Sequence, residues 1–322
     1  VNHSAIITGS FPERTRIVSN LRFDPKTRRG TFIETADFLA APTILERVAQ
    51  AGGRTALLTS KRKLLHFLGR SVHTAVTTEE SPDHLVAARG TPPSISSEAV
   101  ATWPVPVLLS IVEHDHLDLV SCTITDYALH RWSSEAPEAR HYPTQIDRRI
   151  GELFQSIPNH RLFVTADHGM CAKRLAFNPP KVLVRYRIEV TLVRPILDCS
   201  LVHHLHMDST ACVLIHRGSI APAGDILPAV AGFASADDST QTADLFHLPI
   251  SDRGDLSLLG GEHTAFAPSR TLSTIAPEID LRSHGSSHEA IVSRWGRGTD
   301  VSIASRNTDV PGLLGLAAEG RA

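Results

Sequence analysis

The feature that most constrains this chain is the alternation of short apolar, β-branched runs with stretches of helical periodicity. Near-continuous apolar runs of this length are typical of strands covered on both faces, as in parallel sheets. One helical stretch (42–52) opens near a proline and another (142–157) spaces its apolar residues three and four positions apart. The alternation predicts an α/β fold, a mostly parallel sheet flanked by helices. The strand candidates are TALLTS (55–60), VPVLLSIV (105–112), DLVSCTIT (118–125) and RLFVTAD (161–167).

The pattern changes between about residues 172 and 275, where prolines and polar clusters interrupt shorter strand candidates such as KVLVRYRIEV and TACVLIHR. We therefore expect 172–275 to form a smaller inserted cap on an α/β core made of 1–171 and 276–322. The tail after about residue 295 has weak periodicity, and we expect it to be poorly ordered.

The composition excludes several classes of protein. Lys and Arg total 32 against 34 Asp and Glu, which excludes a strongly basic nucleic-acid binder and a disordered acidic chain. The apolar runs fall far short of the roughly 18 residues that cross a bilayer. No CxxC pair occurs, which favours free thiols in a reducing compartment over a disulfide framework. With no export signal in the sequence, the cytoplasm is the expected location. The cysteines are Cys122, Cys171, Cys199 and Cys212.

The first candidate site is TDYALH, in which Asp126 and His130 follow the strand candidate 118–125. A carboxylate at the end of a strand and an imidazole four residues later, on an incipient helix, can converge on one side of the sheet edge. The pair could supply an oxygen and a nitrogen ligand to one cation. The DxxxH pattern is common by chance, so an Asp cap beside an unrelated surface His is the competing interpretation.

The second candidate is TADHGM, in which Asp167 and His168 end the next strand candidate. Neighbouring side chains on a strand point to opposite faces, but a sharp turn at Gly169 allows both to face one cavity. We expect the two strands to deliver two acid–imidazole pairs to the same edge of one sheet. Two cations held there would clamp the attacking and leaving oxygens of a phosphoryl group.

Three further patterns contain chemically useful side chains. A catalytic zinc has three protein ligands, and His284 in SHG is a candidate for the third, with His288 as its competitor. The segment SKRK places Lys61 and Lys63 in phase after a strand, where both could face an anion or simply form a solvated basic turn. The His-rich stretch at 202–209, with His203 and His204, is interpreted as part of the cap.

Taken in order, these segments resemble the alkaline phosphatase superfamily, most closely the phosphonoacetate hydrolase family. VNHSAIITG resembles the segment after that family's catalytic threonine, and the stretch from APTILERV to LHFLG resembles its helix, strand and paired lysines. TDYALH, TADHGM and SHG resemble its three metal-ligand motifs. The resemblance covers most of the chain and implies a dizinc hydrolase that cleaves the carbon–phosphorus bond of phosphonoacetate to acetate and phosphate.

The resemblance also implies roles for particular residues. One zinc is assigned to Asp126, His130 and His284, and part of the other site to Asp167 and His168. Asn20 is assigned as a donor to a phosphoryl oxygen, and Lys61 and Lys63 as the cations that neutralise the substrate carboxylate. The implied ligand is a small anionic phosphonate, with neither nucleic acid nor membrane as a partner. A homodimer remains open as the assembly.

The chain departs from the family pattern in four places. The family's nucleophilic threonine and an early zinc-binding aspartate are expected before Val1, so we expect this chain to be a fragment without them and to show little hydrolysis. Thr15 and Arg16 stand where relatives usually carry His-Gly, and Cys171 stands where Asn is common. Two alternatives stay open, a nucleotide pyrophosphatase or phosphodiesterase with the same metal site, and an inactive metal-binding remnant.

Overall fold

The computed structural model describes residues 1–24, 26–157, 159–199, 205–230, 232–249, 254–267, 275–286, 294–298, 300–303 and 305–316. Its backbone divides into two compact units. Unit 1 contains residue 1, 11–33 and 166–292, and unit 2 contains 2–10, 34–165 and 293–322. The predicted cap, 172–275, lies wholly within unit 1, but unit 1 also takes in 11–33 and the metal-ligand candidates at 167, 168 and 284.

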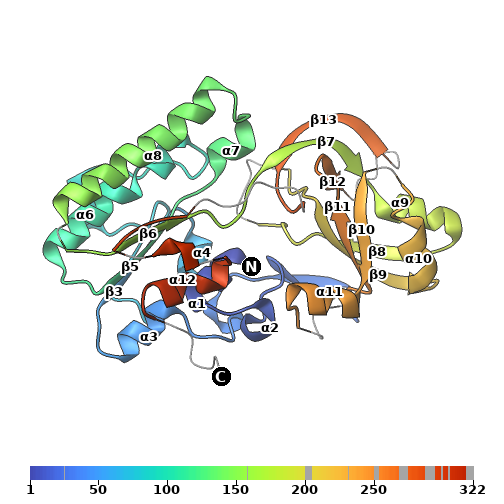
Figure 1. The fold of residues 1–322 in the computed structure, drawn as a ribbon, viewed down its shortest axis with the longest axis horizontal. Helices are drawn as coiled ribbons and strands as arrows, with labels where there is room; N and C mark the ends of the chain where they lie inside the picture. The colour runs from blue at the N-terminus through green and yellow to red at the C-terminus, as the bar shows by residue number, and fades with distance from the viewer. Residues whose placement is uncertain are drawn as a thin grey trace. The chain divides into compact units, whose positions relative to one another are not determined.

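Unit 2 is built on a three-stranded parallel sheet. Its strand order is β4 (Thr74–Thr77), β3 (Thr55–Thr59) and β5 (Leu119–Thr123). Every residue of β3 is buried, as expected of a central parallel strand. Figure 1 shows helices α6 (Pro104–His114) and α8 (Pro137–Ser156) on one side of these strands and α3 (Ile44–Gln50) on the other. The predicted α/β class is therefore confirmed.

Helix α3 shows why the sequence folds as it does locally. The Thr43 hydroxyl accepts a hydrogen bond from the Glu46 amide at 3.0 Å, and the Glu46 carboxylate accepts one from the Thr43 amide at 2.8 Å. This capping box satisfies amide groups that have no partner within the helix. The buried Ile44 and Leu45 then direct the helix toward the core.

The run 105–112 was predicted to be a strand, and that prediction is wrong, because it forms most of α6. Pro104 stands at the start of the helix, where a missing amide hydrogen costs nothing. Val107, Leu108 and Ile111 are buried in one core cluster with residues of β3 and α8. A helix buried over much of its surface has the same continuous apolar sequence as a buried strand.

Two more elements of unit 2 bear on the site. Strand β6 (Leu162–Thr165) pairs antiparallel with β14 (Arg294–Arg297), whereas β5 pairs with β3. In the described part of the chain no ladder joins β5 to β6, so the expectation that both belong to one sheet is not met. The tail is also more ordered than expected, since α12 (Val310–Leu313) buries Val310 and Leu313.

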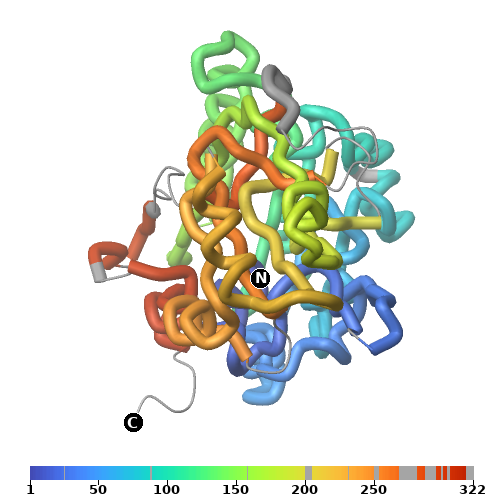
Figure 2. Tube along the Cα trace, turned by 90° about the vertical axis from the view of Figure 1, so that its right-hand side faces the viewer, coloured from blue at the N-terminus to red at the C-terminus, as the bar shows by residue number. Residues whose placement is uncertain are grey.

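Among the described residues, unit 1 contains two larger sheets and the small antiparallel sheet of β1 (Leu21–Asp24) and β2 (Arg29–Phe32). An antiparallel sheet has the order β10 (Phe233–Asp238), β11 (Leu256–Gly260), β9 (Thr210–Arg217) and β8 (Glu189–Val193). In the second sheet, β7 (Cys171–Phe177) lies between β12 (Thr264–Phe266), which is parallel to it, and β13 (Ile275–Ser283), which is antiparallel. Figure 2 shows β7 in yellow-green beside β13 in orange. One apolar core joins both larger sheets and includes Phe177, Val213, Leu258 and Phe266.

The strand prediction for KVLVRYRIEV (181–190) is wrong for all but its last two residues. Pro179 and Pro180 start helix α9 (Pro179–Leu183), and Asn178 caps it by accepting a hydrogen bond from the Lys181 amide at 3.3 Å. Only the end of the run forms a strand, β8. The TACVLIHR prediction is confirmed as β9.

The remaining elements are short. In unit 1 they are α2 (Pro12–Thr15), β1 (Leu21–Asp24), β2 (Arg29–Phe32), η3 (Val184–Tyr186), α10 (Ile220–Ile226) and α11 (Ser239–Phe246). In unit 2 they are α1 (Asn2–Thr8), η1 (Ala36–Phe38), α4 (Arg62–Leu68), α5 (Asp83–Arg89), η2 (Glu98–Ala101), α7 (Tyr127–Arg131), η5 (Val301–Ile303) and η6 (Asn307–Asp309). None of the helices in the described residues is long and apolar enough to cross a membrane.

Candidate active site

Asp126 and His130 lie together just beyond the carboxyl end of β5, as predicted. Asp126 precedes the first turn of α7, and His130 follows one helical turn later. His130 Nε2 lies 3.2 Å from Asp126 Oδ2, and the His130 side chain is only 5% exposed. The two donors therefore face each other at the buried side of a short helix, a position in which one cation could contact both.

Tyr142 on α8 supports the turn that carries Asp126. Its hydroxyl donates a hydrogen bond to the Thr125 carbonyl, and its ring packs with Ala128 in a small buried cluster. Burial raises the pKa of the Tyr142 hydroxyl, and the neighbouring Asp126 carboxylate raises it further. The hydroxyl therefore stays protonated and keeps its hydrogen for the Thr125 carbonyl. Sequence reasoning missed this residue, since only its apolar spacing in a helix was visible.

The second acid–imidazole pair lies in unit 1, in the segment that precedes β7. His168 Nε2 is 3.5 Å from Asp167 Oδ2, and His168 Nδ1 is 3.0 Å from the Gly169 carbonyl oxygen. The His284 ring lies against the His168 ring, with centroids 4.1 Å apart and planes tilted by 38°. Unit 1 thus brings two imidazoles together from segments more than 100 residues apart, and the Asp167 carboxylate lies beside one of them.

The loop that carries His284 is tied down on both sides. The His284 carbonyl accepts a hydrogen bond from the Ser209 amide at 3.0 Å, and the Gly285 carbonyl accepts one from the Thr210 hydroxyl at 2.7 Å. Gly285 has a φ of +92°, which L side chains rarely adopt, and a Cβ there would lie 2.8 Å from Thr210 Oγ1. Glycine at this position therefore lets the histidine loop lie directly on the start of β9.

The two lysines of SKRK lie at the start of α4, beyond the end of β3. Lys61 has extended backbone angles and precedes the helix, whereas Lys63 is within its first turn. The strand-like alternation used to predict a common direction does not apply here, because β3 ends at Thr59. Between the two, the Arg62 guanidinium lies 3.6 Å from a Glu80 carboxylate oxygen.

Asn20 lies in unit 1, in the bend before β1. Its amide N–H donates to the Pro195 carbonyl at 2.9 Å, and Nδ2 donates to the Ile196 carbonyl at 3.4 Å. Arg16, in the position where relatives usually carry glycine, adopts a left-handed backbone with φ 63° and ends α2. Arg16 thus adopts the left-handed conformation that glycine adopts more easily. The bend that contains Asn20 therefore forms with arginine at position 16.

The residues present fit a zinc ion in the chemistry of their donors, because carboxylate oxygen and neutral imidazole nitrogen are ordinary zinc ligands. Across the described ranges, however, no three His, Cys, Asp or Glu side chains gather closely enough to hold a metal ion. The donors occur as close pairs, one in each unit. The prediction that Asp126 and Asp167 face a common cavity involves both units and stays a prediction. His203, His204 and His288 lie outside the described residues.

Solved structures of phosphonate and phosphodiester hydrolases are similar to this chain in fold. Phosphonoacetate hydrolase from Sinorhizobium meliloti 1021, in complex with phosphonoformate, is 25% identical, with a TM-score of 0.86 over 96% of this chain and 82% of that one. Murine ectonucleotide pyrophosphatase / phosphodiesterase 5, in an inactive form with AMP, is 18% identical, with a TM-score of 0.68 over 99% of this chain and 84% of that one. The second likeness concerns the fold alone.

A family model gives the identification. The model for type I phosphodiesterase / nucleotide pyrophosphatase matches residues 1–178, which is 178 of 322 residues and more than half of the chain. This chain belongs to the type I phosphodiesterase / nucleotide pyrophosphatase family. The predicted membership of the alkaline phosphatase superfamily is thereby confirmed.

Proposed function

We propose that this protein is a zinc-dependent phosphonoacetate hydrolase, which adds water across the carbon–phosphorus bond to give acetate and phosphate. The likeness to the Sinorhizobium meliloti enzyme carries the proposal, because it extends over 96% of the chain at a TM-score of 0.86. The same enzyme is also known in complex with phosphonoacetate, at a TM-score of 0.85 to this chain.

In this proposal the acid–imidazole pairs hold the metals. Asp126 and His130, 3.2 Å apart, are ligands of one zinc, and Asp167 and His168, 3.5 Å apart, are ligands of the other. His284 is assigned to the first zinc by resemblance, and its ring lies against that of His168, a ligand assigned to the other zinc, with centroids 4.1 Å apart. Bound zinc would supply positive charge to the phosphoryl oxygens and activate the nucleophile.

Three other side chains bind the anionic substrate. Lys61 and Lys63 neutralise its carboxylate and stabilise the negative charge that develops on the departing acetate carbon. Asn20 donates to a phosphoryl oxygen, which its amide can do while keeping its bond to the Ile196 carbonyl, because Nδ2 carries two hydrogens. In this proposal the two lysines determine the substrate specificity, and Asn20 orients the phosphoryl group.

A nucleotide pyrophosphatase is the second candidate, favoured by the family model and by the fold shared with an AMP-bound relative. That activity needs a pocket for a nucleobase, which proteins usually line with aromatic side chains. This chain has three Trp, three Tyr and eleven Phe in 322 residues. The paired lysines after β3 suit a small carboxylate better than a base, so we rank phosphonoacetate first. An inactive metal-binding remnant is the remaining alternative.

The test compares, for the intact natural protein, phosphate release from phosphonoacetate and from the phosphate monoester of an uncharged aryl group with release of nucleoside monophosphate from a nucleotide phosphodiester. We expect Lys61→Ala and Lys63→Ala each to lower kcat/KM for phosphonoacetate by roughly 30-fold or more, since losing a partner of a desolvated charge costs about 2–5 kcal/mol. Turnover of the aryl ester should change little, because it has no carboxylate to neutralise.

Arg62→Ala is the matched control, because it removes a positive charge from the same turn, and Arg62 faces Glu80. It should leave the preference for phosphonoacetate intact. Equal losses of kcat/KM for phosphonoacetate and for the aryl ester would mean that the lysines only support the fold. Faster cleavage of the nucleotide than of phosphonoacetate would refute the substrate assignment and leave the family membership standing.

A further inference from the structure

A buried lysine and a cysteine lie in contact at the start of β7. Lys173 is completely buried, and its Nζ lies 2.9 Å from Cys171 Sγ. Residues two apart on a strand point to the same face, so the strand itself brings the amine and the thiol together. None of the proposed hydrolytic steps uses either group.

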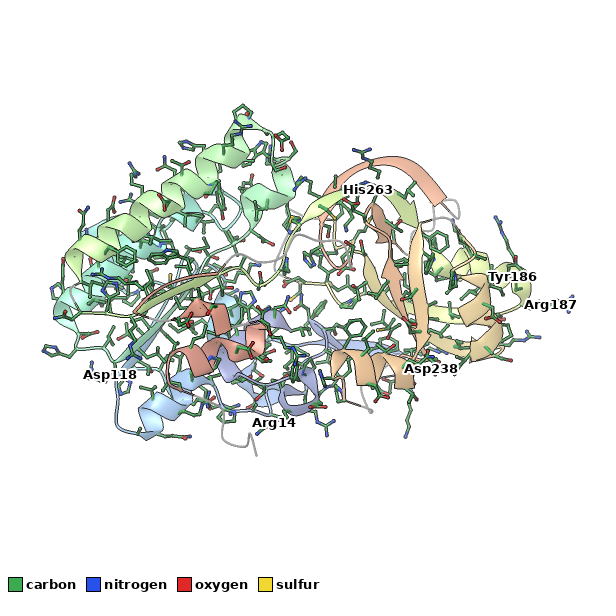
Figure 3. All side chains as sticks on the ribbon, viewed as in Figure 1. Arg14, Asp118, Tyr186, Arg187, Asp238 and His263 are labelled. Carbon is green, nitrogen blue, oxygen red and sulfur yellow. The ribbon has the colours of Figure 1, made fainter. Side chains whose placement is uncertain are left out.

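The backbone of a neighbouring turn fixes the pair. The Glu262 carbonyl oxygen accepts a hydrogen bond from Lys173 Nζ at 3.1 Å and one from Cys171 Sγ at 3.2 Å. The next residue, His263, labelled in Figure 3, is held to β7, since its carbonyl accepts from the Arg174 amide and its ring lies 2.9 Å from the Ala172 carbonyl. The amine and the sulfur therefore meet at a fixed point of a hydrogen-bonded sheet.

The thiol is accessible from outside while the amine is not. Cys171 is partly exposed, in contrast to the fully buried Lys173. A small oxidant can therefore reach the sulfur and form a product directly beside the amine. The first product of peroxide attack on a cysteine sulfur is a sulfenic acid.

We propose that Cys171 and Lys173 form an oxidation site, at which a peroxide joins the thiol and the amine covalently through one oxygen atom. In the first step, hydrogen peroxide transfers an oxygen to the Cys171 sulfur, and water leaves. In the second step, a bond forms between that oxygen and Lys173 Nζ. The Lys173 amine and the sulfenic hydroxyl each lose one hydrogen to a second molecule of hydrogen peroxide, which is thereby reduced to two waters. A Lys173 side chain that starts as an ammonium also releases one proton.

The bridge suits the observed spacing. At 2.9 Å the nitrogen and sulfur are too far apart for a direct bond, but one bridging atom fits between them with little movement of the strand. The product holds its sulfur in an oxidised, disulfide-like state, so a thiol reductant should cleave it and restore both side chains.

The experiment is tryptic peptide mapping of the natural protein after treatment with hydrogen peroxide. The bridge adds one oxygen and removes two hydrogens, a gain of about 14 Da on the peptide that contains both residues. Trypsin cleaves after a free lysine, so cleavage after Lys173 should be lost with the oxidant and regained with dithiothreitol. Oxidation of Met170 in the same peptide gives about 16 Da and resists that reductant.

Two variants complete the test. Cys171→Ser should abolish the gain of about 14 Da, and Lys173→Arg should leave Cys171 oxidised without a bridge. The exposed Cys199 reports how far general oxidation has gone. Normal cleavage after Lys173 while Cys171 gains only oxygen would refute the proposal, as would a loss of about 2 Da, which indicates a direct sulfur–nitrogen bond. The peptide map of the wild-type protein tests the proposal even where a variant fails to fold.

Discussion

Gly285 gives the most direct check on how unit 1 holds His284. We expect Gly285→Ala to destabilise the protein for two separable reasons. A non-glycine residue in a left-handed backbone conformation costs about 1–2 kcal/mol, and φ here is +92°. The new Cβ would also lie 2.8 Å from Thr210 Oγ1, 3.2 Å from the Thr210 amide nitrogen and 3.3 Å from the Ser209 amide nitrogen.

The size of the second effect follows from how little those atoms can move. The Ser209 amide is bound to the His284 carbonyl and the Thr210 hydroxyl to the Gly285 carbonyl, so relief of the clash breaks one of these bonds. Overpacking of this kind costs about 1–3 kcal/mol. The total expected loss is therefore about 2–5 kcal/mol in the free energy of unfolding.

The assay is urea-induced unfolding followed by circular dichroism, with Gly52→Ala as the matched control. Gly52 has nearly the same φ, +87°, but a Cβ there meets no atom within 4 Å. It should lose only the backbone cost of about 1–2 kcal/mol. A double-mutant cycle with Thr210→Ala should show coupling, because that change removes the nearest clashing atom. Equal losses for the two glycine variants, together with an additive cycle, would contradict the clash argument.

Two further predictions concern single positions. Arg16→Gly should raise the free energy of unfolding in urea by about 0.5–1 kcal/mol, because the strain of a left-handed arginine exceeds the entropy cost of glycine. The control is Arg14→Gly, which lies within α2 and should lower the free energy of unfolding. Asp126→Ala and His168→Ala should each lower bound zinc from about two to about one per chain, measured by elemental analysis of the intact protein. The control is Glu135→Ala, which removes an exposed carboxylate beside Arg140 and should leave the zinc content unchanged. Unchanged zinc in Asp126→Ala or His168→Ala would remove that residue from the ligand set.

The sequence predicted those elements whose signals are local. Strand β3 was predicted from a short run that combines β-branched and apolar residues, and α3 from a proline near its start and a glycine at its far end. The run in α6 was misassigned because an apolar stretch of strand length has no periodicity to reveal a buried helix. The tail was misjudged because α12 is held by burial of Val310 and Leu313, a tertiary effect with no sequence period.

The candidate site divides in the same way. The Asp126–His130 and Asp167–His168 pairs could be predicted because short spacing alone brings their donors within 3.2 and 3.5 Å. Tyr142 could not, because its hydrogen bond to the Thr125 carbonyl depends on how α8 packs. The Lys61 and Lys63 argument failed in its geometry because it assumed a strand that continues past Thr59.

His284 shows how one strand register can place a residue that spacing leaves open. In the antiparallel pairing of β13 with β7, Ser283 lies opposite Cys171. His284 directly follows the last residue of β13, and Met170 directly precedes the first residue of β7, so the ladder directs His284 toward the segment that holds His168. A slip of two residues would keep every side chain on its face but move His284 by about 7 Å along the strand, far from a ring now 4.1 Å away. The pairing of β7 with β13, rather than the SHG motif, is therefore what brings the two imidazoles together.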